Sequence, residues 1–303
     1  MTNKWTEDSI ESQKGKTVII TGGSSGIGLE AAKVLSSKGA NVIIAVRNLE
    51  KGESAALKIK DEHPNAIIEV MQIELSDLDS VKKFAKNFSL KYTNLDILIN
   101  NAGVMVPPLK LTSQGYELQF GTNHLAHFAL TGLLLPLMKE VPGSRVVTVS
   151  SIAARGGKIY FDNLDAKKGY AAFKFYSQSK YANLLFGKRL DYILKERSHQ
   201  TKSIICHPGV SATNLTSRGS GKPSPGILSW GFRLVGQPAH MGALPTLFAA
   251  TEPTLKGGEV IGPDGWDNWR GYPAVSNDMN RYYKESVAEK LFNISAEITG
   301  IAI

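Results

Sequence analysis

The sequence predicts an α/β fold with a doubly wound parallel sheet of about seven strands flanked by helices. Residues 17–20 are apolar and strand-like, and a glycine-rich turn at 21–28 leads directly into a helix-like run. The segments 42–46 and 97–99 are apolar at nearly every position, as expected for parallel strands buried on both faces. Strand-like and helix-like patterns then alternate, which favours a sheet that binds ligands at the carboxyl ends of its strands.

The individual elements follow from hydrophobic periodicity and from helix-end signals. The third helix has the clearest start, because Ser76 can act as N-cap with Asp79 three residues later, a variant of the capping box. We expect strands at 16–21, 41–46, 67–73, 95–100, 144–150 and 202–206, with a short seventh strand near 257–261. We expect helices at 26–38, 50–62, 77–91, 113–139, 172–196 and 239–251.

Length and composition indicate one large core. The chain has 303 residues, of which 42% are hydrophobic, and the alternating pattern continues past residue 200 without a linker. We therefore expect a single domain over 14–303, preceded by an extension at 1–13. The only cysteine, Cys206, lies in an apolar run, which excludes an internal disulfide and predicts a buried, inert thiol.

Charge and hydropathy restrict the environment and the partners. No apolar stretch reaches ~18 residues and the first residues are polar, so we expect a cytoplasmic protein without stable membrane insertion. The net charge is +8, but acidic residues are interspersed among the basic ones, and no basic block carries interleaved aromatic residues. We therefore expect attraction for an anionic cofactor rather than binding to nucleic acid.

The glycine-rich turn has the pattern Gly22-x-x-x-Gly26-x-Gly28 between a strand and a helix, and it also contains Ser24, Ser25 and Ile27. Gly22 permits a tight turn, Gly26 allows a pyrophosphate to approach the backbone, and Gly28 allows the helix to pack against the strand. Unpaired N–H groups at the helix N-terminus would bind the phosphates. The turn therefore predicts a dinucleotide site, with a glycine-rich turn that holds no ligand as the alternative.

Tyr176 and Lys180 are spaced by one helical turn, so they lie on the same helix face. A free phenol, with a pKa near ~10, is a poor acid or base at neutral pH. At ~4 Å and an effective dielectric constant of ~20, an ammonium favours the phenolate by roughly 4 kcal/mol, or about three pKa units, before desolvation reduces the effect. The pair therefore predicts a tyrosine general acid or base, although an ordinary amphipathic helix can have the same spacing.

Tyr170 and Lys174 repeat this spacing six residues earlier. Such a shift rotates a helix by about 240° net, so the two pairs face different sides and only one can line a given cleft. We favour Tyr176 because its neighbours are small or polar, namely Ser177, Ser179, Ala182 and Asn183.

Arg47 and Asn48 follow the second expected strand, where an NAD enzyme usually carries an acid for the ribose 2′-hydroxyl. An arginine can instead pair with a 2′-phosphate, although it could also be an ordinary surface cation. We therefore expect NADP(H) to be preferred, with NAD(H) as the alternative cofactor.

Four motifs in this order resemble the short-chain dehydrogenase/reductase superfamily, namely Thr21-Gly22-x-x-x-Gly26-x-Gly28, Asn100-Asn101-Ala102-Gly103, Tyr176-x-x-x-Lys180 and Pro208-Gly209. The resemblance extends from about Lys14 to the C-terminus. The segments 176–183 and 47–48 are most similar to the retinol-dehydrogenase-like and WW-domain-oxidoreductase-like group. The resemblance implies a Rossmann-type domain and an oxidoreductase that transfers hydride between nicotinamide and a carbonyl or alcohol.

The same resemblance implies four catalytic residues. Tyr176 would be the general acid in reduction and the base in oxidation, while Lys180 would lower its pKa and hold the nicotinamide ribose. Ser151 would donate a hydrogen bond to the substrate oxygen. Asn123 would hold a water that links the lysine to solvent.

For the cofactor, the resemblance implies an adenine contact by Glu74 and Leu75, where the family commonly has an aspartate. The family sometimes adds a basic residue at the position of Ser25, and its absence weakens the expected preference for NADP(H). Other residues would border the adenine ribose or hold the nicotinamide carboxamide. These remaining expected contacts are Asn101, Ala102, Gly103, Val149, Pro208, Val210 and Thr213.

Two segments are expected to form walls of the substrate mouth. One is 158–163, within an insertion between Ser151 and Tyr176, and the other is the loop region 211–240, whose apolar stretch extends over 215–241. Loops at such positions carry specificity. An apolar lid favours a lipophilic aldehyde, ketone or alcohol, but the same residues could pack on the core or meet a membrane surface.

Other classes stay open as alternatives. An epimerase or dehydratase of the extended branch would normally have the spacing Gly-x-x-Gly-x-x-Gly. A non-catalytic NADP-binding regulator or interaction protein would need only the dinucleotide site. Homo-oligomers through 113–139 and 172–196 are common in the family. We expect His124, His127 and His207 to be packing groups, because no acid or cysteine set for a metal accompanies them.

Overall fold

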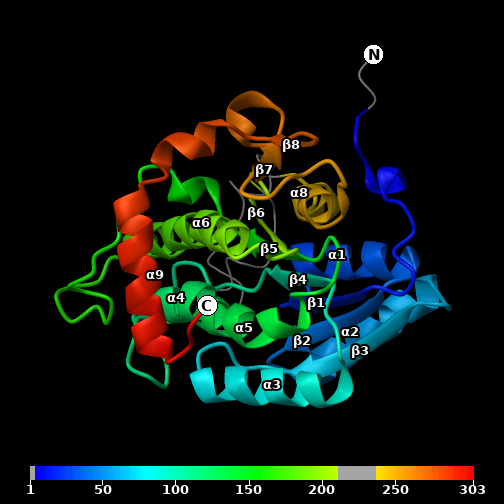
Figure 1. The fold of residues 1–303 in the computed structure, drawn as a ribbon, viewed down its shortest axis with the longest axis horizontal. Helices are drawn as coiled ribbons and strands as arrows, with labels where there is room; N and C mark the ends of the chain where they lie inside the picture. Colours follow the sequence, from blue (N-terminus) through cyan, green and yellow to red (C-terminus); the bar gives the residue numbers. More distant parts are fainter. Residues whose placement is uncertain (1–3, 211–236) are drawn as a thin grey trace.

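A computed structural model describes residues 4–210 and 237–303. These residues form one eight-stranded sheet in the order β3-β2-β1-β4-β5-β6-β7-β8, with the first seven strands parallel and β8 antiparallel to β7 (Figure 1). The α/β fold with a mostly parallel sheet is therefore confirmed. The strands are β1 (Thr17–Thr21), β2 (Asn41–Val46), β3 (Ile67–Gln72), β4 (Ile97–Asn100), β5 (Arg145–Val149), β6 (Lys202–Cys206), β7 (Val260–Pro263) and β8 (Pro273–Val275).

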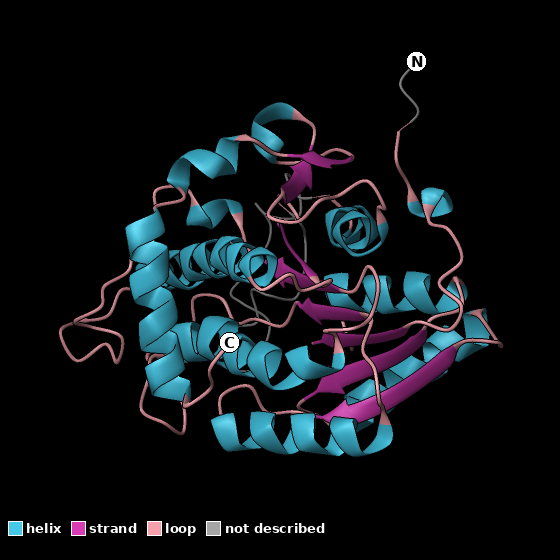
Figure 2. Ribbon diagram, in the orientation of Figure 1, coloured by secondary structure: helices cyan, strands magenta, loops and turns pink. Residues whose placement is uncertain are grey.

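Helices cover both faces of the sheet, as the cyan ribbons of Figure 2 show. One apolar cluster joins the sheet to α1, α2 and α8, and a second joins the opposite face to α3, α5 and α6. The helices are α1 (Gly26–Ser37), α2 (Leu49–Glu62), α3 (Leu78–Lys91), α4 (Leu118–Phe120), α5 (Ala126–Leu134), α6 (Ala172–Glu196), α8 (Ala239–Thr251) and α9 (Glu285–Thr299).

The expected single helix at 113–139 is wrong in its start and in its continuity. Residues 111–117 form a turn in which the Thr112 N–H donates to the Tyr116 carbonyl, so the helix begins only at Leu118. Residues Gly121–Leu125 then widen into a π turn, which separates α4 from α5. The helix finishes as a 3₁₀ turn at Leu135–Leu137, where Pro136 lacks the N–H that a regular helix needs.

Three smaller expectations also need correction. Asp77, not Ser76, caps α3, because the Ser76 hydroxyl donates instead to Glu74 Oε1 at 2.8 Å. The seventh strand begins at Val260, since Gly257 and Gly258 before it have φ of +96° and +83°, which no strand adopts. Helix α9 and strand β8 were not expected at all.

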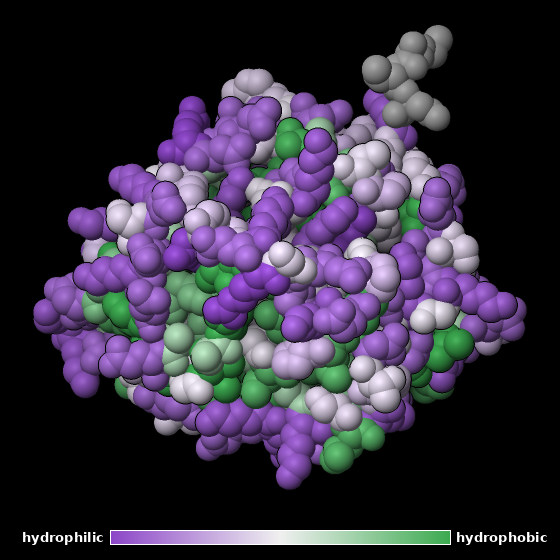
Figure 3. All heavy atoms as spheres, viewed as in Figure 1, coloured by the Kyte–Doolittle hydropathy of each residue, from purple (hydrophilic) through white to green (hydrophobic). Residues whose placement is uncertain are grey.

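Helix α9 lies across α5 and α6, as the red helix beside them in Figure 1 shows. The chain then ends against α5, where a Cβ at Gly132 would lie 2.5 Å from Ile301. Figure 3 shows apolar atoms gathered between α9 and α3 on this side of the molecule. A homo-oligomer through the outer faces of the segments 113–139 and 172–196 would therefore have to include α9 and the C-terminal residues in its interface.

The first described residues pack on the same core. Ile10 is buried, and the Trp5 ring meets Phe248 of α8 edge to face at 5.1 Å between centroids. Cys206 is fully buried beside Thr246, as expected, and burial raises the pKa of its thiol to about 12. None of the helices in residues 4–210 and 237–303 is both long and apolar enough to cross a membrane.

Candidate active site

The expected site residues gather at the carboxyl ends of β1, β4 and β5. The strand order reverses between β1 and β4, and in open parallel sheets a ligand crevice forms at such a point. The glycine turn follows β1, the Asn101–Gly103 segment follows β4, and Ser151 follows β5. The fold thus assembles the predicted cofactor and catalytic residues on one edge of the sheet.

The glycine turn is shaped for close approach of a ligand. Gly22 and Gly26 have φ of +69° and +57°, which favours glycine at both positions. A Cβ at Gly28 would lie 2.6 Å from both Asn101 Nδ2 and the Gly22 carbonyl oxygen. Ser25, at the N-cap of α1, makes no side-chain capping bond, so backbone N–H groups of the first turn stay available to an anion. These features fit a dinucleotide pyrophosphate.

A network of polar side chains fixes the turn to β4. The Thr21 hydroxyl accepts hydrogen bonds from the N–H groups of Asn101 and Ala102, and Asn101 Nδ2 donates to the Thr21 carbonyl at 2.8 Å. His127 Nε2 lies 2.9 Å from the same hydroxyl, and its Nδ1 lies 3.1 Å from the Asn123 carbonyl. Since a carbonyl only accepts, Nδ1 carries the proton. Burial lowers the pKa of His127 to about 4, so the imidazole is neutral and Nε2 accepts from Thr21.

At the end expected to bind the adenosine, the Arg47 side chain is 68% exposed and lies next to a carboxylate. Its Nε is 3.7 Å from Glu74 Oε2, and the other Glu74 oxygen accepts from the Ser76 N–H and hydroxyl. Leu75 is buried, while Asn48 caps α2 by accepting from the Lys51 N–H at 2.8 Å. Asn48 therefore has a structural role that the sequence did not indicate.

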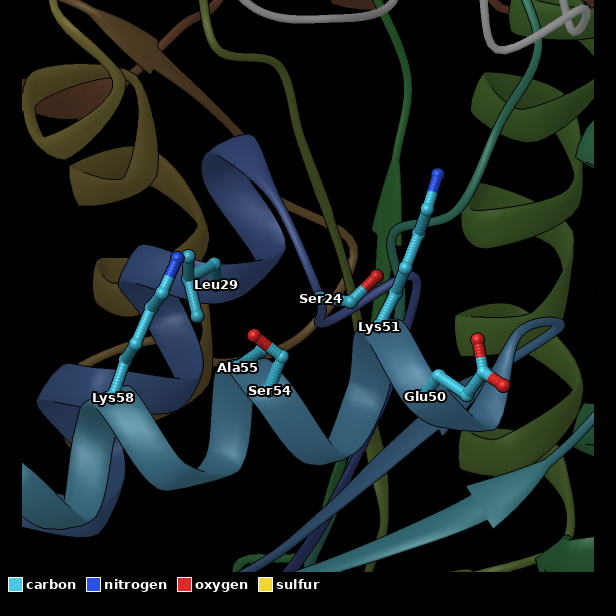
Figure 4. Close-up of a pocket in the computed structure, with 7 residues that line it drawn as sticks. All are labelled: Ser24, Leu29, Glu50, Lys51, Ser54, Ala55 and Lys58. Carbon is cyan, nitrogen blue, oxygen red and sulfur yellow. The ribbon is translucent and has the colours of Figure 1, made fainter.

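A hollow of about 310 Å³ lies between the glycine turn and α2. Figure 4 shows its lining, with Lys51 extending past Ser24 of the turn and Lys58 beside Leu29 of α1. The hollow therefore presents Lys51 beside the turn and Lys58 beside α1, together with the acidic Glu50.

Tyr176, Ser151 and Lys180 meet at the end of β5. Tyr176 is 6% exposed, and the Ser151 side chain lies close enough to lower the pKa of its hydroxyl. Lys180 is also buried, and its Nζ donates to the Val149 carbonyl at 3.0 Å. A Cβ at Gly103 would lie 3.6 Å from that Nζ, so the segment after β4 passes directly over the lysine.

The expectation that Lys180 lowers the pKa of Tyr176 is wrong for this structure. Burial raises the pKa of Tyr176 to about 12, against a smaller opposing effect of the Ser151 hydrogen bond. Burial also lowers the pKa of Lys180 to about 8. The reason is that both groups are buried, so desolvation is the largest influence on each pKa, while the lysine donates to the Val149 carbonyl. Tyr176 is consequently a protonated phenol at neutral pH.

Asn123 lies in the π turn and bridges two segments. Its Oδ1 accepts from the Val104 N–H at 2.8 Å, and its Nδ2 donates to the Val104 carbonyl and to the Ser179 hydroxyl. Ser179 in turn donates to the Tyr176 carbonyl at 2.8 Å. Asn123 therefore connects the segment after β4 to the tyrosine-bearing helix.

The alternative pair does not form. Tyr170 precedes α6, so it is not helical, and its hydroxyl donates to the Pro107 carbonyl at 2.7 Å. Lys174 lies over the Tyr160 ring, 3.9 Å from its centroid, rather than beside Tyr170. Burial raises the pKa of Tyr170 to about 12 without a neighbouring ammonium.

The nicotinamide end is described only in part. The Val210 N–H donates to the Trp269 carbonyl at 2.8 Å, and Gln237 Nε2 donates to the Pro208 carbonyl. In the 158–163 segment, the Tyr160 N–H donates to Gln178 Oε1, which places this segment against α6 two residues after Tyr176. Thr213 and most of the expected second wall, residues 215–236, lie outside the described residues.

Sequence reasoning missed several residues that shape the site. Thr21 and His127 join β1 to the π turn, and Gln119 joins the segment after β4 to α6. One signal was available for Gln119, because it lies one helical turn before Asn123. The hydrogen bond between Thr21 and His127 joins residues that are 106 positions apart, and no local pattern reveals it.

Comparison with known proteins agrees with this geometry. The family model described as short chain dehydrogenase matches residues 16–222. Human retinol dehydrogenase 11 is 37% identical over 289 residues, which cover 95% of this chain and 87% of that protein. The chloroplastic short-chain dehydrogenase TIC 32 B of Brassica napus is 42% identical over 294 residues, covering 94% and 89% respectively.

Among solved structures, a protein from Mycobacterium paratuberculosis described as putative and uncharacterized has a TM-score of 0.82 and 37% identity. The match covers 99% of this chain and 98% of that one. The family model, the sequence relatives and the solved structure thus agree with one another. The chain belongs to the short-chain dehydrogenase/reductase family and is an NAD(P)-dependent oxidoreductase that acts on CH–OH groups.

Proposed function

We propose that the protein prefers NADP(H) and exchanges a proton with a lipophilic carbonyl or alcohol through Tyr176. The observation that carries the proposal is the buried cluster at the end of β5, in which Ser151 lies beside the Tyr176 hydroxyl and Lys180 lies one turn later on the same helix. Bound at the glycine turn, the nicotinamide cofactor would supply or accept hydride. Gly22, Gly26 and Gly28 would hold its pyrophosphate, and Lys180 would hold its nicotinamide ribose.

The proton chemistry follows from the state of the phenol. In reduction, negative charge develops on the carbonyl oxygen, which needs a hydrogen-bond donor and then a proton. Ser151 donates to that oxygen, and Tyr176 transfers its proton to it. The resulting phenolate is stabilised by the Lys180 ammonium, which predominates at pH 7 because its pKa is about 8. With a resting pKa of about 12, Tyr176 holds its proton at neutral pH, and the Lys180 ammonium would have to lower that pKa for the transfer to the substrate oxygen.

The cation set at the adenosine end supports NADP(H) over NAD(H). Arg47 is exposed at the end of β2 and can pair bidentately with a 2′-phosphate. The Glu74 carboxylate beside it limits the preference, because it would compete for the guanidinium and repel the phosphate. Lys51, in the hollow beside the turn, adds positive charge on the same side.

Aromatic residues near the site support a lipophilic substrate. Phe173 is 64% exposed, and its ring lies 6.3 Å from that of Tyr176. Trp266 is 79% exposed and packs edge to face on Trp269, whose carbonyl accepts from Val210. Relatives named for retinol, a long apolar alcohol, support the same substrate class.

The test compares two tyrosine substitutions on one helix. NADPH oxidation is followed by absorbance with a panel of aldehydes and ketones, and NADPH binding is followed by fluorescence. Tyr176→Phe should lower kcat about 1,000-fold, since a positioned general acid contributes typically 10²–10⁴-fold, while NADPH affinity stays unchanged. Tyr181→Phe, a buried tyrosine of α6 bonded to the Tyr282 carbonyl, is the matched control and should keep wild-type turnover.

Retained turnover in Tyr176→Phe would contradict the proposed role, above all if Tyr170→Phe were inactive. Best turnover with small polar sugars only would end the lipophilic-substrate proposal. Equal catalytic efficiency with NADPH and NADH would remove the cofactor preference.

A further inference from the structure

Gln119 is a fully buried amide that makes hydrogen bonds to two separate segments of the site. Its Oε1 accepts from the Val106 N–H at 2.8 Å. Its Nε2 donates to the Ala172 carbonyl at 2.9 Å and lies 3.2 Å from the Tyr170 hydroxyl. Reversing the amide would set two donors against each other at Val106 and two acceptors at Ala172, so its orientation is fixed by its partners.

One partner of Gln119 belongs to the turn of α6 that carries Tyr176. Ala172 is the first residue of α6, and in α-helix geometry its carbonyl is the acceptor for the Tyr176 N–H. Gln119 therefore bonds to the same carbonyl oxygen as the tyrosine backbone. The neighbouring Tyr170 hydroxyl strengthens the contact by donating to the Pro107 carbonyl, on the segment that Gln119 also holds.

The other partner is a strained residue. Val106 has φ of +51°, a conformation that is costly for a β-branched side chain and persists only where surrounding contacts impose it. Two buried amides hold this segment, Asn123 at Val104 and Gln119 at Val106. The segment begins at Gly103, directly over Lys180.

We infer that Gln119 is a positioning residue, which fixes the first turn of α6 against the 103–107 segment so that the Tyr176 hydroxyl faces the reacting oxygen. The inference rests on the proposed role of Tyr176. Gln119 would be a second buried amide, one helical turn before Asn123, that holds the tyrosine at a fixed distance from the 103–107 segment. Misplacement of a catalytic group by about 1 Å can cost up to 10²-fold in rate.

The experiment uses two substitutions of similar volume. Gln119→Met removes every hydrogen bond of the amide, namely those with Val106, Ala172, Tyr170 and Glu117, and we expect kcat to fall about tenfold or more with unchanged NADPH affinity. Gln119→Glu keeps the acceptor for Val106 but loses the donor for Ala172 when the acid is ionised. When it is protonated, the introduced acid can donate again. Burial beside Glu117 will raise the pKa of this acid, so kcat relative to wild type should recover as the pH falls from about 8 to about 6.

A readout independent of turnover is amide hydrogen exchange. Protection of the Val106 N–H and of the first turn of α6 should fall in Gln119→Met. The matched control is Gln114→Met, which removes another amide that joins two segments. Gln114 Oε1 accepts from the Leu78 N–H and its Nε2 donates to Asp77, so this amide joins the turn at 111–117 to the start of α3. It should leave kcat and the exchange at Val106 unchanged.

A flat ratio of Gln119→Glu to wild-type kcat across this pH range would overturn the inference, as would wild-type turnover in Gln119→Met. Either result, combined with an inactive Tyr176→Phe, would reject only the role of Gln119. An active Tyr176→Phe would instead reject the proposed function itself.

Discussion

The two halves of the site are built in different ways. The dinucleotide half consists of the turn after β1 and the ends of β2 and β3, and its main features lie within single short segments such as 21–28. The substrate half joins Asn123, Ser151 and Tyr176 to the segment after β4 through buried side chains far apart in sequence. Local sequence therefore specifies most of the proposed dinucleotide half, which tertiary hydrogen bonds join to β4 through Thr21 and Asn101, whereas the proposed substrate half depends on tertiary hydrogen bonds throughout.

The ionisable groups of the two halves differ in their burial. Arg47 is largely exposed, so its charge is available to a ligand at little cost. Lys180 and Tyr176 are both buried, and desolvation shifts the pKa of each toward its neutral form. With pKa values of about 12 and about 8, Tyr176 is neutral at pH 7 while Lys180 still carries its charge, so a phenolate formed there would have an ammonium one helical turn away.

The largest effect is expected for Gly28→Ala in the dinucleotide half. The added methyl would displace Asn101 from the Thr21 carbonyl and should weaken NADPH binding by about 1–3 kcal/mol, or roughly 10- to 100-fold. Binding is measured by fluorescence titration. Gly132→Ala is the control, since its methyl would meet Ile301 instead and should cost stability without weakening binding. Equal NADPH affinities in Gly28→Ala and Gly132→Ala would contradict the role of the glycine turn in binding the dinucleotide.

The next effect is a pH dependence in the substrate half. Burial lowers the pKa of His124 to about 3, well below its unfolded value. The unfolded chain therefore takes up a proton first as the pH falls, and stability present above about pH 6.5 is lost toward pH 3. At pH 5 this amounts to about 2 kcal/mol for one histidine.

Urea unfolding at several pH values measures this effect. His124→Gln should show a smaller loss of unfolding free energy between pH 7 and 5 than wild type. The exposed His240 provides the control, and His240→Gln should follow the wild-type curve. If the unfolding free energy of His124→Gln fell with pH as steeply as that of the wild type, burial of neutral His124 would not be the cause of the loss of stability in acid.

The smallest effect concerns cofactor choice. Arg47→Ala should weaken NADPH binding about tenfold and leave NADH binding nearly unchanged, because only NADPH carries the 2′-phosphate. Glu74→Gln should act in the opposite direction by freeing the guanidinium. Lys60→Ala, at the far end of α2, controls for the loss of one positive charge. Equal weakening of NADPH and NADH by Arg47→Ala would contradict the assignment.

The same division explains what could be predicted from the sequence. The parallel strands, α1 and the glycine turn follow from apolar runs and from glycines that local sterics require. The bonds of Gln119 could not be foreseen, because their partners lie elsewhere in the chain. The pKa of Tyr176 was misjudged for the same reason, since burial depends on the whole fold. The capping role of Asn48 is different, because its partner is the N–H of Lys51 three residues later.

The most direct test of the central claim is a crystal structure of the protein with NADP⁺ and an unreactive carbonyl ligand. The account predicts the Tyr176 hydroxyl and the Ser151 hydroxyl within about 3 Å of the ligand oxygen, beside the nicotinamide ring. A Tyr176 hydroxyl turned away from that oxygen, with Tyr170 or no tyrosine in its place, would contradict it.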